Sequence, residues 1–449
     1  MTDKNSSAME KLMSKILGDG AEYADIRAQR INEKSYIMKN RELDRALECF
    51  EDGVGFRILK NGSWSFGSYC GMEPKPELVS KHLPGGEVKL ADAEPARGEV
   101  SWKAKKEWDE DEAYSMMRDM DEHMRVGKAE RSLRVELSTW NLDTYFLSSE
   151  GSDIHQSIPY STISIKCVAR ENGAVQSYSQ RFGNVGGVEI FDEKELMEEA
   201  ERCSKTANLL LSARAPPSGR MKVICDQDLA GVMAHEAVGH AAEGDLVANG
   251  ESILEGKIGK KVANELVTIV DDPNRKGMGS FVYDDEGVRG REKKLIENGV
   301  LCQYIVDRAY GYKLGFEPNG GARAESYGDV PLVRMSNTFI APGKWSLDEL
   351  LENMGNGIYL MGSRGGEVDT THGSFQFNAK MGHLVKNGEI GEMIRDVSLQ
   401  GSILQTLNDL IALGKDLRLH PGFCGKGQTV PVGTGAPHIL LKNGVVGGL

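Results

Sequence analysis

The most informative segment of this sequence predicts a strand that is followed directly by a helix. Residues 221–240 read MKVICDQDLAGVMAHEAVGH. The apolar run Met221–Cys225 predicts a buried strand, and the apolar residues that recur after it predict an amphipathic helix. Asp226 or Asp228 can cap that helix, because a carboxylate at this position accepts hydrogen bonds from the first free backbone N–H groups. We therefore expect a strand followed directly by a helix that carries two histidines.

The segment before this stretch predicts a domain boundary. Arg214–Arg220 contains two prolines and a glycine, a composition typical of a linker. A chain of 449 residues also exceeds the size of one ordinary hydrophobic core. We expect an N-terminal domain over residues 1–213, a linker over 214–220 and a C-terminal domain over 221–449. The predicted fold class is α+β, with a largely antiparallel sheet plus helices in each domain.

Alternating apolar and polar residues predict strands in both halves. In the N-terminal half, we expect strands over residues 24–69 and 131–182, helices over 7–17, 107–126 and 191–213, and a loop or mobile insertion over 71–100. In the C-terminal half, we expect short strands and one later helix, over residues 403–413. Asn-Gly pairs favour tight type I′ turns and therefore predict hairpins. These pairs are Asn61-Gly62, Asn172-Gly173, Asn298-Gly299, Asn387-Gly388 and Asn443-Gly444.

Composition excludes several classes of protein. The net charge of -13 disfavours a nucleic-acid partner, because an acidic surface repels phosphates. No apolar run is long enough to predict a membrane span, and the first residues have no apolar core of a secretory signal. The seven cysteines include no CxxC pair, which argues against a disulfide framework. We therefore expect a cytoplasmic protein with no membrane and no nucleic-acid partner.

The predicted helix after residue 226 carries a metal-binding pattern. A hydrolytic zinc site needs neutral imidazole ligands, an open coordination position and a carboxylate near the attacking water. His235 and His240 can supply two ligands, and Glu236 can serve as the general base. The alternative is a helix with two hydrogen-bonded histidines and a solvated glutamate.

The spacing of the two histidines predicts an irregular helix. Residues five apart lie about 140° apart around a regular α-helix, too far for His235 and His240 to share one ion. A single wide turn of the π type would return both to one face, and such turns favour functional sites. Gly239 would make a local backbone distortion easier.

A glycine-rich loop near the end of the chain holds a third candidate ligand. Gly422–Gln428 reads GFCGKGQ, which places Cys424 among glycines that allow close backbone approach. A thiolate is a good ligand for zinc. The alternative is a buried cysteine with a purely structural role.

Together these motifs resemble the TldD/PmbA family of metallopeptidases. The resemblance spans residues 221–445 and fits more loosely before them. The pieces that carry it are HEAVGHAAEGD at 235–245, DEG at 285–287, LIENGV at 295–300, RMSNT at 334–338, GEVD at 366–369 and CGKGQTVPVG at 424–433.

The resemblance implies a TldD-type catalytic subunit that hydrolyses unfolded polypeptides or peptide precursors. It implies that His235, His240 and Cys424 bind Zn²⁺ and that Glu236 is the general base. Glu243 and Asp245 match family positions, with a supporting or capping role. The resemblance also implies a homodimer, or a heterodimer with a TldE/PmbA-type subunit. Two alternatives stay open: a non-catalytic assembly subunit with a structural zinc, and a hydrolase of another amide bond.

Overall fold

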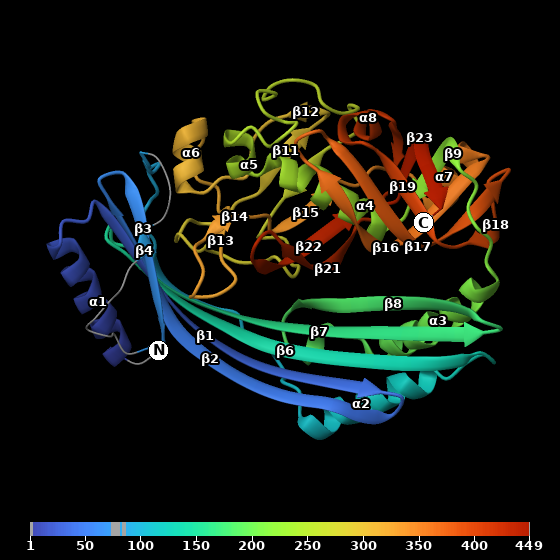
Figure 1. The fold of residues 1–449 in the computed structure, drawn as a ribbon, viewed down its shortest axis with the longest axis horizontal. Helices are drawn as coiled ribbons and strands as arrows, with labels where there is room; N and C mark the ends of the chain where they lie inside the picture. Colours follow the sequence, from blue (N-terminus) through green and yellow to red (C-terminus); the bar gives the residue numbers. More distant parts are fainter. Residues whose placement is uncertain (1–2, 73–80, 83–86, 449) are drawn as a thin grey trace.

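A long curved sheet forms most of the N-terminal half (Figure 1). The computed structural model describes residues 3–72, 81–82 and 87–448. The strands of this sheet are β1 (Tyr23–Lys39), β2 (Glu42–Lys60), β3 (Ser63–Cys70), β4 (Lys81–His82), β5 (Arg97–Ser101), β6 (Glu130–Ser148), β7 (Asp153–Glu171) and β8 (Ala174–Val185). Their order is β4-β3-β2-β1-β6-β7-β5, and β8 also pairs with β7. All these pairings are antiparallel except that of β5 with β7.

Helices cover one face of this sheet and leave the other face toward the C-terminal half. The helices of the N-terminal half are α1 (Asp3–Gly18), α2 (Glu110–His123) and α3 (Glu193–Ser212), with a short 3₁₀ turn at Val188–Ile190. Leu133, Val135 and Leu137 of β6 and Ile163 and Ile165 of β7 are buried against α2 and α3. Because successive residues of a strand alternate between faces, the intervening side chains point the opposite way.

The C-terminal half is built on two larger sheets and a two-stranded one. Its strands are β9 (Gly219–Cys225), β10 (Ile269–Asp271), β11 (Lys293–Glu297), β12 (Val300–Leu301), β13 (Ala322–Arg323), β14 (Leu332–Val333), β15 (Asn337–Ile340), β16 (Gly357–Asp369), β17 (Ser374–Lys386), β18 (Glu389–Ile394), β19 (Val397–Ser402), β20 (Leu410–Leu413), β21 (Arg418–Gly425), β22 (Thr429–Ala436) and β23 (Ile439–Gly448). The order β12-β11-β10-β15-β22-β21 forms one sheet, and β13 pairs with β14. The order β16-β9-β23-β19-β17-β18 forms the other, with β20 on β23, and pairing of β16 with β17 closes it into a ring.

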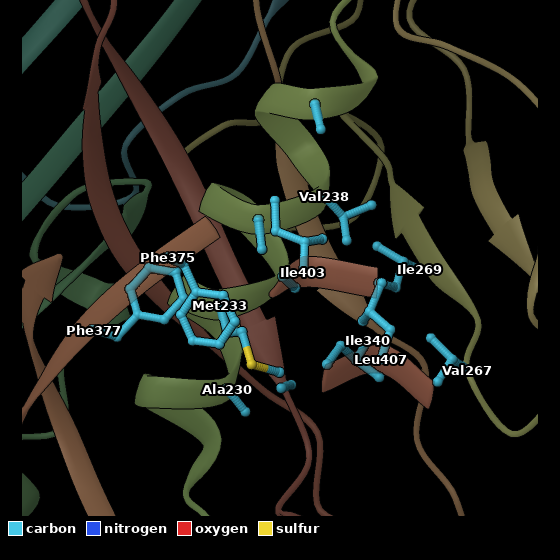
Figure 2. Close-up of a cluster of buried hydrophobic side chains, with 14 of the residues drawn as sticks. Ala230, Met233, Val238, Val267, Ile269, Ile340, Phe375, Phe377, Ile403 and Leu407 are labelled. Carbon is cyan, nitrogen blue, oxygen red and sulfur yellow. The ribbon is translucent and has the colours of Figure 1, made fainter. Parts of the chain in front are cut away.

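A helical segment buried between these sheets carries the predicted metal pattern. It consists of α4 (Gln227–Met233), a π-helical segment (Ala234–Gly239) and a 3₁₀ turn (His240–Ala242). The remaining helices are α5 (Gly244–Ala248), α6 (Arg308–Leu314), α7 (Leu347–Met354) and α8 (Ile403–Asn408). Figure 2 shows Ala230, Met233 and Val238 of this segment within the same apolar cluster as residues of β10, β15, β17 and α8. The segment is therefore fixed by the core of the C-terminal half.

The α+β class with antiparallel sheets is confirmed, and several local predictions are wrong. Asn443-Gly444 does not turn a hairpin but lies inside β23, where the register with β9 shifts. The single helix expected over 403–413 is the short α8 followed by β20, and α5, α6 and α7 also interrupt the strands. Within the expected loop 71–100, residues 73–80 and 83–86 lie outside the described residues, and β5 begins at Arg97.

The sequence contains no apolar run long enough to predict a membrane span. No helix in the described part of the chain is both long enough and apolar enough to cross a membrane.

Candidate metal centre

The helical segment starts at a side-chain cap and loses its regular spacing at the first histidine. The Asp226 carboxylate accepts a hydrogen bond from the Leu229 N–H at 2.9 Å and so caps α4. The backbone becomes π-helical over Ala234–Gly239. This is the wide turn that the five-residue spacing of the histidines predicted, and it brings their side chains toward one side.

Gly239 has a different role from the one expected. Its φ of -55° and ψ of -57° are ordinary right-handed helical values, so the backbone there needs no glycine. A Cβ atom at this position would lie 1.9 Å from the sulfur of Met335, which is fully buried. Gly239 is therefore needed for close packing of the segment against Met335.

The structure brings the three candidate ligands together. Ligand atoms of His235, His240 and Cys424 all lie within 4.8 Å of one another. Nε2 of His240 and Sγ of Cys424 are 3.2 Å apart. His235 comes from the π-helical segment and Cys424 from β21, so the cluster joins the helix to the edge of a sheet.

A buried carboxylate orients the second histidine. Oε2 of Glu243 lies 2.9 Å from Nδ1 of His240 and accepts its N–H, which leaves Nε2 directed toward Cys424. Glu243 is fully buried. Burial would lower the pKa of His240, but Glu243 and Cys424 outweigh it and raise that pKa above its ordinary value. Burial would raise the pKa of Glu243, but His240 and then Lys426 outweigh it and lower that pKa.

The thiol of Cys424 loses its proton more readily than an ordinary cysteine, because its pKa is lowered. Burial alone would raise its pKa, but hydrogen bonds with His235 and His240 outweigh burial and lower the pKa to about 4. A thiolate is the form in which cysteine binds a metal. In the metal-free chain at neutral pH, the thiolate is therefore paired with the protonated ring of His240, and a metal ion would displace that proton.

Lys426 connects the cysteine loop to the acidic residues after the histidines. Its Nζ lies 3.0 Å from Oε2 of Glu243 and 2.6 Å from Oδ2 of Asp245, and it also donates to the carbonyl oxygen of Val333. Burial and Glu243 raise the pKa of Asp245 above its ordinary value, although Lys426 opposes them. Glu243 and Asp245 thus share one cation that belongs to the loop of Cys424.

Arg334 holds the backbone of that loop. This side chain is 1% exposed and donates to the carbonyl oxygens of Cys424 at 2.6 Å and Gln428 at 2.8 Å. The amide of Gln428 in turn donates to Val330, and its oxygen accepts from the Glu325 N–H. The loop is therefore held by several fixed donors, and the position of Cys424 depends on them.

Glu236 lies at the wall of a cavity between the two halves of the chain. The cavity has a volume of about 470 Å³, and both His235 and Glu236 line it. Oε2 of Glu236 is 3.7 Å from Nε2 of His240, and its side chain is 33% exposed. A carboxylate in this position can reach both the three candidate ligands and a molecule in the cavity.

Local sequence patterns point to all four central residues but not to two residues that support them. Lys426 and Arg334 lie within the motifs quoted above, yet no role was predicted for either. A buried arginine has no local signature, because its partners here are carbonyl groups about 90 positions away in the chain. The lysine could have been suspected from its place two residues after Cys424.

The chain is similar to known metallopeptidases along most of its length. The chain matches the PmbA/TldA metallopeptidase domain 1 over residues 24–73, the central domain over 104–211 and the C-terminal domain over 218–448. It is 40% identical over 438 residues to a metalloprotease of Methanothermobacter thermautotrophicus, with 96% of each chain covered. It is 33% identical to the zinc metalloprotease TldD homolog of Saccharolobus solfataricus, which covers 98% of this chain and 100% of that protein.

Solved structures share the fold at lower identity. A Thermotoga maritima protein named as a modulator of a DNA gyrase superimposes with a TM-score of 0.81 at 22% identity, covering 98% of this chain and 99% of that one. TldE from Thermococcus kodakarensis superimposes with a TM-score of 0.75 at 18% identity, covering 98% and 100%. With domain matches along most of its length and relatives that align nearly end to end, this chain belongs to the PmbA/TldD metallopeptidase family.

Proposed function

We propose that this chain is a zinc-dependent peptidase in which His235, His240 and Cys424 hold Zn²⁺ and Glu236 is the general base. The observation that carries the proposal is the convergence of these three ligand atoms within 4.8 Å beside a carboxylate that lines a cavity. A purely structural zinc site needs no acid facing open space and usually closes its fourth position with protein.

The side chains present fit a zinc ion. Ligand atoms at tetrahedral zinc distances are separated by about 3.3–3.6 Å, close to the 3.2 Å between His240 and Cys424. Nδ1 of His235 is buried and has no hydrogen-bond partner among the described residues, so hydrogen bonds of the protein leave this ring nitrogen unused. The depressed pKa of Cys424 and the carboxylate behind His240 favour the ligating forms of both.

In the proposed hydrolysis, the zinc ion and the protein side chains would have different roles. When bound, zinc would polarise a substrate carbonyl and lower the pKa of a water molecule. Glu236 would take the proton of the attacking water at Oε2 and pass it to the leaving amine nitrogen. Glu243 would hold His240 in place through Nδ1, and Lys426 would keep Glu243 ionised within the protein interior.

We further propose that the substrate is an unfolded polypeptide bound in extended form. Two strands at the cavity pair on one side only within the described residues: β8 pairs with β7, and β21 pairs with β22. Residues of both strands line the cavity, including Arg181 and Phe423. A peptide can add its backbone to such an edge with little selection for sequence.

We propose that the chain works as a homodimer or with a TldE/PmbA-type partner. Residues 42–52 of β2 pair with β1 alone in the part of the chain that the structure describes. Leu43, Leu47 and Phe50 on this segment are 45%, 45% and 60% exposed. An open edge with exposed apolar side chains is a common place for a second chain to bind. A cytoplasmic location stays a prediction.

The decisive experiment replaces Glu236. Glu236→Gln removes a proton acceptor and no ligand, so the purified variant should keep about one zinc per chain and cleave an unfolded substrate about 10²–10⁴-fold more slowly. Elemental analysis and digestion of an unfolded protein measure both properties. Glu265→Gln, an exposed acidic position outside the cavity, is the matched control.

Each outcome has a distinct meaning. A Glu236→Gln variant with the turnover of the unchanged protein would remove Glu236 from the mechanism. A metal-loaded chain that cleaves no unfolded protein, alone or with a TldE/PmbA-type partner, would favour the structural zinc. Cleavage of a non-peptide amide alone would favour the other hydrolase.

A further inference from the structure

The cavity wall opposite the metal cluster is a charged patch on the long sheet. It is formed by the face of β6, β7 and β8 that points away from α2 and α3. The strand register places Arg134 of β6 directly opposite Lys166 of β7, and Ser164 of β7 directly opposite Arg181 of β8. The same row continues to Lys39 of β1, which lies opposite Arg134. Cations therefore occupy one row across β1, β6 and β7, and Arg181 of β8 lies diagonally from Lys166.

This arrangement is unfavourable without an anion. Like charges directly opposite each other on paired strands destabilise a sheet. Arg134 has a partner in Glu136 at 3.1 Å, and Lys39 has one in Asp44 at 2.8 Å. Lys166 and Arg181 form no ion pair with any carboxylate in the described ranges. Two cations at the cavity wall thus lack a counter-charge from this protein.

Arg181 is also held in a defined position close to the candidate metal centre. Its Nε donates to Oγ of Ser164 at 3.2 Å. Its guanidinium carbon lies 5.4 Å from the centre of the Phe423 ring, a distance typical of a cation–π contact. Phe423 precedes Cys424 on β21, so the guanidinium is fixed beside the loop that holds the cluster.

The rest of the cavity does not neutralise these charges. On the opposite side, Lys380 pairs with Asp228 at 3.1 Å, and Glu236 is engaged with the metal cluster. The charged side chains that line the cavity are four cations (Arg134, Lys166, Arg181, Lys380) and three acids (Glu136, Asp228, Glu236). The chain as a whole has 54 lysines and arginines against 67 acids. The cavity lining therefore has an excess of cations, whereas the whole protein has an excess of acids.

We propose that Lys166 and Arg181 form a carboxylate-binding subsite that makes this chain selective for acidic peptides. The carboxylate is supplied by a glutamate or aspartate side chain of the substrate or by its free C-terminus. A guanidinium and an ammonium bind a carboxylate by charge-assisted hydrogen bonds, which are stronger than those between neutral groups. The proposal rests on the peptidase function proposed above, and it adds side-chain or end-group selection to backbone recognition.

The test uses one neutral, unfolded parent peptide and three relatives of it. The first relative carries glutamates, the second carries lysines at the same positions, and the third has an amidated C-terminus. Cleavage by the zinc-loaded full chain gives kcat/KM, and fluorescence anisotropy with the Glu236→Gln variant gives binding without turnover. The variant K166Q/R181Q removes the proposed subsite. The control R202Q/K205Q removes two exposed cations of α3 that do not line the cavity.

The expected result is that the glutamate peptide is cleaved and bound about tenfold better than the lysine peptide, in a salt-dependent manner. K166Q/R181Q should abolish this ratio while it still cleaves the neutral parent, and R202Q/K205Q should keep it. A loss of affinity on amidation assigns the carboxylate to the C-terminus, and no loss assigns it to side chains. Equal binding of the acidic and basic peptides together with no loss of affinity on amidation overturns the proposal, as does a preference that is unchanged in K166Q/R181Q. If no peptide is cleaved but the binding ratio is present, the peptidase function fails and the subsite stands.

Discussion

Sγ of Cys424 lies 3.2 Å from Nε2 of His240, although 184 positions separate the two residues in the chain. The contact joins the last part of the chain to the helical segment that follows β9. It requires that β21 pair with β22 and that β22 pair in parallel with β15, beside the π-helical segment. The candidate metal centre therefore depends on strand pairings between distant segments of the C-terminal half.

Removal of the thiol should empty the proposed metal site. Cys424→Ala leaves two histidines as the only proposed protein ligands, so zinc should fall from about one per chain to a small fraction of that value. Elemental analysis after dialysis measures the change. Cys302→Ala is the control, because the thiol of Cys302 donates only to a backbone carbonyl and lies outside the cluster. Unchanged zinc in Cys424→Ala would exclude Cys424 as a ligand.

Local patterns predicted the strand-to-helix segment well because its signals are local. The apolar run of β9, the cap at Asp226 and the five-residue spacing of the histidines all lie within 20 positions. The same holds for Asn61-Gly62, where φ is positive at both residues, as a type I′ turn requires. These features depend little on the rest of the fold.

Asn443-Gly444 shows where such patterns fail. A Cβ atom on Gly444 would lie 2.6 Å from Cγ2 of Val223, so this glycine allows β23 to approach β9 rather than to turn. The short helices α5, α6 and α7 were missed for a similar reason, since segments of five to eight residues are stabilised mainly by their surroundings. The domain division at residues 214–220 stays a prediction.

The ionisation of Cys424 gives a prediction about pH. In the metal-free chain the pKa of this thiol is lowered to about 4, because hydrogen bonds with the two histidines outweigh burial. In an unfolded chain it would be about 8.5. The thiolate should therefore stabilise the folded state fully above pH of about 8.5, and this contribution should be lost as pH falls through about 4.

The ultraviolet absorbance of the thiolate measures this titration directly. The difference between the metal-free chain and its Cys424→Ser variant should show one thiolate at neutral pH that disappears near pH 4. The other six cysteines are present in both proteins, so their absorbance cancels in this difference. A transition near the ordinary thiol pKa would show that the two histidines do not stabilise the thiolate.

Glu243 should control metal affinity without binding the metal. Glu243→Gln keeps the size of the side chain and removes the charge that accepts the His240 N–H. Loss of such an orienting carboxylate typically weakens metal binding about 10–100-fold. Competition with a chelator measures the affinity, and Glu255→Gln, an exposed position, serves as the control. An affinity within a factor of about two of the unchanged protein would remove the orienting role.

Gly239 should be essential for packing rather than for backbone freedom. In Gly239→Ala, the added carbon meets the sulfur of Met335 at 1.9 Å, so the free energy of unfolding should fall by about 1–3 kcal/mol. Gly18→Ala, where nothing lies within 4 Å of the added carbon, should not lose stability. Urea denaturation measures both variants.

A second substitution separates the two explanations for Gly239. Combining Gly239→Ala with Met335→Ala removes the clash, so the double variant should lose less stability than the two single losses added together. Strictly additive losses would mean that the cost arises in the backbone and not in the contact with Met335.

The mode of substrate binding should appear in the positions of the cuts. If a peptide adds its backbone to the edge of β8 or β21, each bound residue offers an N–H that proline lacks. Cleavage should then be poor where proline lies near the scissile bond and should occur in many unrelated sequences. A folded protein should resist, because its backbone is already paired. Digestion of one protein in folded and unfolded forms, with cut sites mapped by mass spectrometry, measures all three effects. Equal cleavage of the folded form, or a single strict cut motif, would contradict edge binding and favour a deep side-chain pocket.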